Sequence, residues 1–237
     1  MKHPSVIYAA AVTLAAVIIL AVLGAPLQAS LGMTGLALTE LMILAVAIAG
    51  AAVVGRLTGE PAKSFFPIRA VSLRQLLGSF VIYIGAYFVM YAAAVVLQYL
   101  FPAAAEEAEY LTGFTTSVPL PLGMLITAVM PAVCEEALHR GVILRCVRGT
   151  AESVYDDSRV IARSALVTIA GGALFGLFHL DPYRFLTTAV LGGAFSYVCF
   201  KTGSMLPGML LHLLNNAFSV MMMYAEKAQE AAAVSAE

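Results

Sequence analysis

Residues 121–147 read PLGMLITAVMPAVCEEALHRGVILRCV, an apolar run that holds four ionisable side chains within six positions: Glu135, Glu136, His139 and Arg140. A helix of about 20 apolar residues is long enough to cross the hydrocarbon core of a bilayer, which is about 30 Å thick. An ionisable side chain at the centre of such a helix costs about 2.5–3.5 kcal/mol, so it indicates a functional site by default. The stretch therefore predicts a membrane span that carries chemistry.

The composition of the whole chain agrees with a membrane protein. Of the 237 residues, 61% are hydrophobic and 11% are charged, whereas a soluble domain is about half apolar and about a quarter charged. The 13 Lys and Arg are balanced by 14 Asp and Glu, so we expect no nucleic-acid partner. The three cysteines lack CxxC spacing and predict neither a disulfide framework nor a cysteine zinc site.

We predict an all-α, polytopic transmembrane bundle of about seven spans, because long runs rich in Ala, Leu, Val and Gly lack the short alternation of a membrane β-barrel. The first run resembles a signal peptide, but its apolar part of about 18 residues exceeds the usual length of about 7–15, which favours a retained span. The predicted spans lie near residues 6–24, 36–54, 77–100, 121–147, 164–180, 186–202 and 204–224.

Loop charges predict the orientation of the bundle, because Lys and Arg near span ends are retained in the cytoplasm. Basic residues follow the second and fourth spans, whereas the loop of residues 101–120 carries only acidic charges. We therefore expect a multi-pass protein with its N-terminus and Lys2 in the cytoplasm and a short tail, residues 225–237, outside. The basic residues that carry this prediction are Arg56, Lys63, Arg69, Arg74, Arg145, Arg148, Arg159 and Arg163.

The segment of residues 65–77 mixes apolar side chains with Arg69 and Arg74. Such a mixture is typical of an amphipathic helix that lies on the cytoplasmic membrane surface. A basic linker whose apolar residues pack on the bundle explains the pattern equally well. Both interpretations place the segment between the second and third spans.

Helical spacing separates the two adjacent carboxylates of the fourth span. Glu136 and Arg140 are four residues apart with the acid first, which is the favourable order for an ion pair. Glu135 points about 100° away around the helix, so it is free to act as a general base toward a water molecule. The alternative is a buried ion-pair cluster near the inner interface, with Arg140 extending to water.

Two other spans supply polar partners at positions that helical geometry relates. His212 and Asn216 are four residues apart and share one face, so they can act as an oxyanion hole worth about 2.7–4 kcal/mol per donor. A membrane His or Asn also commonly bridges helices without catalytic function. At a rise of 1.5 Å per residue, His179 lies about 10 Å further from the inner membrane face than Glu135 and His212 do. Its span is therefore strongly tilted or starts outside the hydrocarbon, or the site occupies a tall water-filled cavity.

In order along the chain, these residues resemble the type II CAAX prenyl endopeptidase and bacteriocin-processing family, also called Abi-type intramembrane glutamic proteases. The family pattern is Glu-Glu-x-x-x-Arg, then Phe-x-x-x-His, then His-x-x-x-Asn or Asp. The resemblance implies a four-helix catalytic core over residues 121–224 around a conical cavity, after N-terminal spans and the amphipathic segment within residues 1–120. The matching residues are Glu135, Glu136, Arg140, Phe175, His179, His212 and Asn216.

The resemblance further implies an endopeptidase that hydrolyses a peptide bond in a membrane-associated peptide or protein, in a prokaryotic plasma membrane. Glu135 would activate a water that His179 helps to hold, and Glu136 with Arg140 would order the site. The oxyanion would be stabilised by His212 and Asn216. The expected partners are the lipid bilayer and the substrate, and no cofactor is expected.

Three alternatives stay open at the level of sequence. Zinc bound by Glu135, His179 and His212 would leave its fourth position to water, although no HExxH motif is present. A non-catalytic immunity or scaffold protein of the same fold would bind a partner without cleaving it. A small transporter or proton relay would also use carboxylates and histidines inside the membrane.

Overall fold

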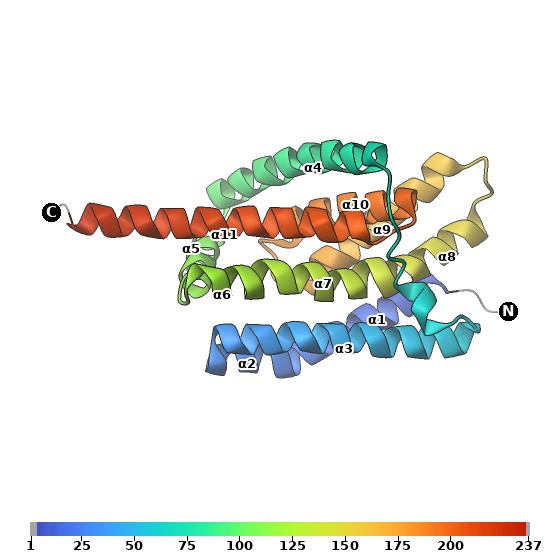
Figure 1. Cartoon of the computed structure of the whole chain (residues 1–237), viewed down its shortest axis with the longest axis horizontal. Helices are drawn as coiled ribbons and strands as arrows, with labels where there is room; N and C mark the ends of the chain where they lie inside the picture. The colour runs from blue at the N-terminus through green and yellow to red at the C-terminus, as the bar shows by residue number, and fades with distance from the viewer. Residues whose placement is uncertain (1–3, 236–237) are drawn as a thin grey trace.

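The computed structural model describes residues 4–235, and within that range seven helical spans are long and apolar enough to cross a membrane, with no β-strand. The spans run side by side along the long axis of the molecule (Figure 1). This confirms the predicted all-α, multi-pass membrane bundle. The spans cover Val6–Leu31, Met33–Thr58, Leu73–Leu100, Leu120–Val154, Val160–Phe178, Phe185–Thr202 and Leu206–Ser235.

Two of these spans are built from several consecutive helical segments. The first joins α1 (Val6–Ile19), η1 (Leu20–Gly24) and α2 (Ala25–Leu31). The fourth joins α6 (Leu120–Met124), η3 (Leu125–Val129), α7 (Met130–Glu136), η4 (Ala137–Ile143) and α8 (Leu144–Val154). The segments η1, η3 and η4 are π-helical, a wider form that often occurs at functional sites.

The other spans are single helices. They are α3 (Met33–Thr58), α4 (Leu73–Leu100), α9 (Val160–Phe178), α10 (Phe185–Thr202) and α11 (Leu206–Ser235). A shorter helix that hydropathy does not predict, α5 (Pro102–Thr115), lies in the acidic loop between α4 and α6. The tail that begins at residue 225 is helical as far as Ser235, because α11 continues through it without a break.

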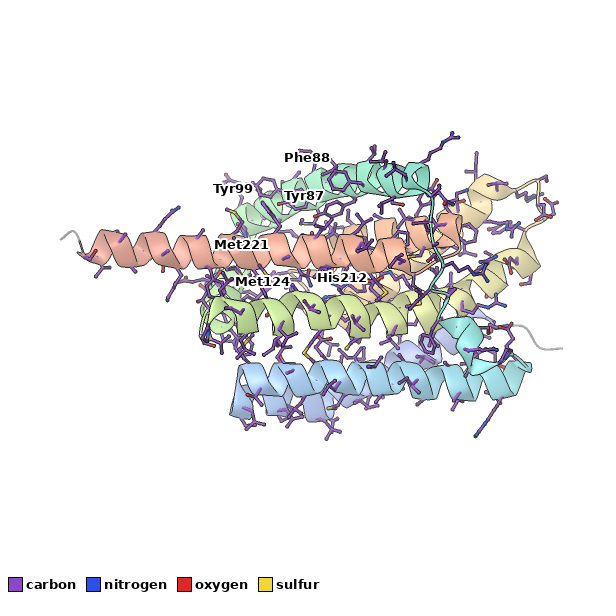
Figure 2. The ribbon with its side chains drawn as sticks, viewed as in Figure 1. Tyr87, Phe88, Tyr99, Met124, His212 and Met221 are labelled. Atoms are coloured by element: carbon purple, nitrogen blue, oxygen red, sulfur yellow. The ribbon has the colours of Figure 1, made fainter. Side chains whose placement is uncertain are left out.

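The polarity of the bundle is the reverse of a soluble protein. Large apolar side chains of α4 point outward; Phe88 is 65% exposed and lies on the outer side of the helix (Figure 2). The charged side chains of Glu136 and Arg140 are instead buried. Figure 2 shows His212 of α11 facing toward α7 in the interior. The polar groups of the fourth and seventh spans therefore meet inside the protein.

Residues 66–72 form a non-helical linker and residues 73–77 are the start of α4, so the predicted separate surface helix over residues 65–77 is wrong. The short 3₁₀ turn η2 (Ala62–Phe65) ends at Phe65, which is fully buried, and α4 begins only at Leu73. Between them, the Ser204 hydroxyl donates to the carbonyl of Arg69 at 2.8 Å and accepts from its amide at 3.0 Å. Insertion of Phe65 into the core and these two bonds hold the backbone in an extended form.

Basic side chains gather at one end of the bundle. The connections α3–α4, α8–α9 and α10–α11 lie at the end of the bundle where α1 begins, and the last turns of α11 lie at the opposite end (Figure 1). The basic residues used to predict the orientation belong to the first two of these connections or to the helix ends beside them. Lys2 lies outside the described residues. The described basic residues that the sequence assigns to one side of the membrane thus lie at one end of the bundle.

The position of α9 explains the depth of His179. In Figure 1 the α8–α9 connection lies further along the bundle axis than the α10–α11 connection. Because α9 begins further out than α11, its C-terminal end reaches the level of His212. The ring of Phe175 confirms this level, since its centroid lies 4.8 Å from that of His179 and 5.9 Å from that of His212. The end of α9 and the middle of α11 therefore lie at the same level along the bundle axis.

Candidate active site

Glu136 connects two of the three motifs through a single oxygen atom. Its Oε1 forms an ion pair with Nη1 of Arg140 at 2.8 Å, one helical turn along the chain, and accepts a hydrogen bond from Nδ1 of His212 on α11 at 2.9 Å. The side chains of Glu136 and Arg140 are fully buried. The ion pair predicted from the spacing is therefore present, and it also bridges the fourth and seventh spans.

Arg140 is enclosed by two further helices. Its Nη2 donates to the carbonyl of Gly192 on α10 at 3.0 Å. The guanidinium lies over the ring of Phe175 at 4.5 Å and over that of Phe195 at 5.3 Å from the ring centroids. Such cation–π contacts are strongest where the cation is desolvated. The alternative in which Arg140 extends to interfacial water is therefore wrong.

Two glycines make room for this buried pair. A Cβ atom at Gly192 would lie 2.6 Å from Cβ of Phe175, and one at Gly208 on α11 would lie 2.8 Å from Oε2 of Glu136. Both distances are shorter than van der Waals contact, so α10 and α11 approach the charged groups only because these positions lack side chains. The ion pair and the helix packing depend on each other.

Glu135 has a different environment from its neighbour. It is 8% exposed, and its Oε2 has no hydrogen-bond partner within residues 4–235. It lies within electrostatic range of His212 and Arg140 without forming an ion pair to either in the described chain. The two adjacent carboxylates are thus separated as the helix geometry predicts: one is bound at the centre of the network, and the other is left free beside it.

The hydrogen bond of His179 fixes which ring nitrogen carries hydrogen. Its Nδ1 lies 2.8 Å from the carbonyl of Phe175, one turn earlier in α9. Since a carbonyl only accepts, Nδ1 must carry the proton, and Nε2 of the neutral ring keeps its lone pair. His179 is half-buried at the end of α9. Its Nε2 is therefore able to accept a hydrogen bond from a water molecule.

Asn216 is held by the backbone carbonyl of Thr127, which lies four residues before a proline. In a regular α-helix the amide of residue 131 would donate to this carbonyl, but Pro131 has no N–H. Nδ2 of Asn216 donates to that carbonyl of Thr127 at 3.2 Å instead. This bond uses one of the two amide hydrogens, so one N–H of Asn216 is left for a ligand.

The neighbouring amide of Asn215 faces a different helix. Its Nδ2 donates to Oδ1 of Asn216 at 3.1 Å, and its Oδ1 accepts from the Tyr83 hydroxyl of α4 at 3.5 Å. Asn215 thus orients the Asn216 amide, and Asn216 is the one that reaches the fourth span. The sequence motif His-x-x-x-Asn identifies the same residue.

The contact of His212 with Glu136 limits what its ring can donate. With Nδ1–H directed to the carboxylate, Nε2 is an acceptor in the neutral ring and a donor only in the imidazolium form. An oxyanion hole built from His212 and Asn216 therefore requires a protonated His212. Glu136 is placed to stabilise that charge at 2.9 Å.

Three ionisable residues near the site do not appear in the sequence-based prediction of site residues. Glu40 of α3 is 3% exposed, lies within electrostatic range of Glu135, and its Oε2 has no partner in the described chain. His139 packs edge-on between Phe175 and Phe178, at 4.8 Å from each ring centroid. Arg184 is the residue directly before α10 and is partly buried.

Of these three, Glu40 had a usable signal in the sequence, because it is an acidic residue in an apolar span. Arg184 had none, since it lies in a connection where a basic residue is ordinary. His139 has the contacts of a core residue: both of its ring nitrogens are buried and without a partner in residues 4–235. The site that the fold assembles therefore has more ionisable groups around it than the three motifs suggest.

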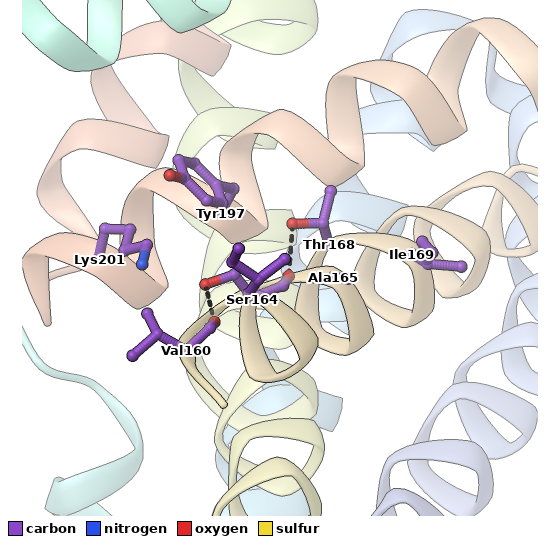
Figure 3. Close-up of a pocket in the computed structure, with 8 residues that line it drawn as sticks. Val160, Ser164, Ala165, Thr168, Ile169, Tyr197 and Lys201 are labelled. Carbon is purple, nitrogen blue, oxygen red and sulfur yellow. Dashed lines mark hydrogen bonds between the residues drawn. The ribbon is translucent and has the colours of Figure 1, made fainter. Parts of the chain in front are cut away.

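Two grooves lie away from these residues. One, of about 510 Å³, lies between α9 and α10 and is lined by Ser164, Thr168, Tyr197 and Lys201 among others (Figure 3). The other, of about 210 Å³, is apolar and lies between α3, the linker, the fourth span and α11. Neither is lined by the six predicted site residues, so the conical cavity stays a prediction. Within residues 4–235, no three His, Cys, Asp or Glu side chains are grouped as a metal site.

Residues 117–218 match a family model described as Rce1-like, type II CAAX prenyl endopeptidase. The matched range begins just before α6 and contains all six predicted site residues. It confirms the resemblance expected from the sequence and supports a membrane protease of the CAAX type. Searches of curated proteins and of solved structures found no match.

The link between Pro131 and Asn216 predicts a non-additive pair of substitutions. Asn216→Ala leaves the Thr127 carbonyl without its partner, which should lower the free energy of unfolding by about 1–3 kcal/mol. Adding Pro131→Ala supplies an amide N–H to that carbonyl, so the double variant should recover part of the loss. Chemical unfolding in detergent micelles measures the coupling, which we expect to be about 0.5–3 kcal/mol.

Asn215→Ala is the matched control for this cycle, because Asn215 does not contact the Thr127 carbonyl. Combined with Pro131→Ala, it should show a smaller coupling. Strict additivity of Asn216→Ala and Pro131→Ala would mean that the proline does not determine how Asn216 is held.

Proposed function

We propose that this protein is an intramembrane endopeptidase that hydrolyses a peptide bond in a membrane-associated peptide or protein. The main support is the contact between Glu136 and His212, 76 residues apart in the chain, in the interior of the bundle. That contact places the Glu-Glu-x-x-x-Arg and His-x-x-x-Asn motifs side by side. The family match over the same helices supports a membrane protease.

In the proposed reaction, Glu135 is the general base. It takes a proton from a water molecule that also donates to Nε2 of His179, and the resulting hydroxide attacks the carbonyl carbon of the substrate. The proton on Glu135 is then delivered to the leaving amine. A base with a suitably placed water contributes about 10²–10⁴-fold to such a rate. The free Oε2 of Glu135 and the free Nε2 of His179 support these roles.

The charge that develops on the carbonyl oxygen is stabilised by α11. The remaining N–H of Asn216 and Nε2–H of protonated His212 are the proposed donors. Preorganised donors of this kind act strongly because they need no rearrangement as charge develops. Glu136 and Arg140 hold His212 in position and keep its charge balanced, so they act through His212 and not on the substrate.

The role of Glu135 predicts that Glu135→Gln will lower cleavage by about 10²–10⁴-fold, because the amide cannot accept the proton. The measurement is quantitative proteomics of membrane peptides in cells that produce either form at equal levels. Glu109→Gln, in α5 and outside the site, is the matched control and should cleave like the wild type. Full cleavage by Glu135→Gln would contradict the mechanism.

An identical peptide pattern with and without the protein would point to the non-catalytic immunity or scaffold function. In that case alanine at Glu135 and His179 should leave the cellular phenotype intact. A protease changes the set of membrane peptides, whereas an immunity or scaffold protein does not, so the same proteomics measurement separates the two functions.

We also propose that hydrolysis does not require a metal ion. Nδ1 of His212 is already bound to Glu136 and Nδ1 of His179 to a backbone carbonyl, and these side chains are not grouped as a metal site in the described chain. Chelator treatment of the purified protein should leave cleavage unchanged. Stoichiometric zinc, together with activity that chelation removes and zinc restores, would establish the zinc-dependent alternative.

For the orientation, we propose that the basic end of the bundle faces the cytoplasm of a prokaryotic cell. Lys63→Cys in η2 and Glu109→Cys in α5 place one exposed thiol at each end. A membrane-impermeant maleimide should label Glu109→Cys in intact cells and Lys63→Cys only after permeabilisation. The wild type gives the background, which should be low because Cys134, Cys146 and Cys199 are buried. The reverse labelling pattern would invert the topology.

A further inference from the structure

The helices α9 and α10 pack closely over their middle portions, because both have glycine there. A Cβ atom at Gly172 would lie 2.5 Å from the carbonyl oxygen of Ala189. One turn away, a Cβ atom at Gly193 would lie 3.1 Å from the carbonyl oxygen of Thr168. The two contacts follow in opposite order along the two helices, so α9 and α10 are antiparallel and their register is fixed.

Toward the basic end of the bundle, large side chains take the place of glycine and a groove of about 510 Å³ opens between the helices. The same register continues to Ser164 and Tyr197, and one turn further to Val160 and Lys201. Figure 3 shows these side chains on the two sides of the groove. The Ser164 hydroxyl donates to the carbonyl of Val160 and the Thr168 hydroxyl to that of Ser164, each at 2.8 Å. The floor of the groove therefore keeps its donors for its own backbone and offers an apolar surface.

The groove is open on the outer surface of the bundle. Its α9 rim carries Ile161, Ala165 and Ile169, which are four residues apart and share one face. Ile161 is 86% and Ile169 is 70% exposed, as expected of side chains that contact lipid. From Val160 to Ile169 the groove extends about 14 Å along α9, close to the hydrocarbon thickness of one leaflet, about 15 Å. It is therefore long enough for an acyl chain of that leaflet.

Lys201 places a cation at the polar end of this groove, next to the end of α10. Its Nζ lies 5.6 Å from the ring centroid of Tyr197 and 6.0 Å from that of Phe200. Both rings are within the range of cation–π contacts, which hold the ammonium in place without neutralising it. No carboxylate in residues 4–235 forms an ion pair with Lys201.

The carboxylates of α8 and of the α8–α9 connection are engaged elsewhere. Glu152 pairs with Arg148 at 2.6 Å, and Asp157 pairs with Arg163 at 2.6 Å. Asp156 accepts hydrogen bonds within its own turn. The ammonium at the groove is therefore left for an anion from outside the chain, and a phosphate in the adjacent headgroup layer is such an anion.

We propose that the groove between α9 and α10 binds one anionic phospholipid from the leaflet at the basic end, with an acyl chain between the helices and its phosphate at Lys201. Basic pockets between membrane spans recognise anionic headgroups in this way. A zwitterionic lipid fits the apolar groove equally well, but its amine cancels the attraction of its phosphate for Lys201. None of the six predicted site residues lines the groove, so this binding is independent of the proposed endopeptidase function.

A tryptophan reporter tests the proposal, because the chain has no Trp of its own. Ile169→Trp places the fluorophore at the deep end of the groove, where acyl chains that carry bromine quench it. The purified full-length variant is reconstituted in vesicles of phosphatidylglycerol and phosphatidylcholine in which either lipid is the brominated one. Phosphatidylglycerol should bind about 5-fold tighter, the effect of one cation near anionic lipid. Phe88→Trp, on the outer side of α4, is the matched reporter and should show no preference.

Substitutions in the Ile169→Trp protein identify the cation responsible. Lys201→Gln should abolish the preference for phosphatidylglycerol, and Lys201→Arg should keep it. Lys63→Gln removes an exposed cation elsewhere at the basic end and should leave the preference unchanged. If Lys201→Gln does not accumulate, salt still decides, because an exposed charge is screened within about 10 Å at 0.1 M salt and within about 3 Å at 1 M. The preference should fall as the salt concentration rises.

Equal quenching of Ile169→Trp by the two lipids would indicate ordinary lipid contact and would overturn the inference. A preference that survives Lys201→Gln, resists high salt, or disappears with Lys63→Gln would overturn it as well. Quenching of Phe88→Trp but not of Ile169→Trp by either lipid would mean that protein covers the groove, such as a second copy of this chain, and would also reject the lipid site.

Discussion

The buried ion pair of Glu136 and Arg140 is the constraint on which the rest of the structure depends. Removing two charges from water costs several kcal/mol for each ion, and their attraction offsets this only when the remaining hydrogen-bonding groups are also satisfied. Here His212 shares the carboxylate oxygen, the carbonyl of Gly192 takes the second guanidinium nitrogen, and Phe175 covers the charge. These contacts satisfy only part of the pair, because Oε2 of Glu136 and Nε of Arg140 have no hydrogen-bond partner within residues 4–235, but they join α7, α9, α10 and α11 around it.

The backbone contributes as much to this arrangement as the side chains do. Gly192 and Gly208 allow two helices to approach the charges closely, and the missing N–H of Pro131 provides the carbonyl that holds Asn216. The π-helical segment η4 carries Arg140 within the same network. The polar network thus depends on these backbone features as well as on its side chains.

Sequence patterns predict relations within a helix better than relations between helices. Hydropathy identifies the seven spans, and the spacing of Glu136 and Arg140 predicts their pair, because both depend on local geometry alone. The contact of His212 with Glu136 and the enclosure of Arg140 depend on how each helix is rotated against its neighbours. The segment of residues 65–77 shows the same limit: its pattern suits a surface helix, and the burial of Phe65 decides against one.

The contact between His212 and Glu136 also gives the proposed reaction a simple charge balance. With His212 protonated, Glu135 and Glu136 are balanced by Arg140 and His212, so these four groups have no net charge before the reaction. When Glu135 accepts the proton of water, its charge disappears and an equal charge develops on the substrate oxygen beside His212. Negative charge moves across the site while the total stays at zero, which matters because net charge is costly in a medium of low dielectric constant.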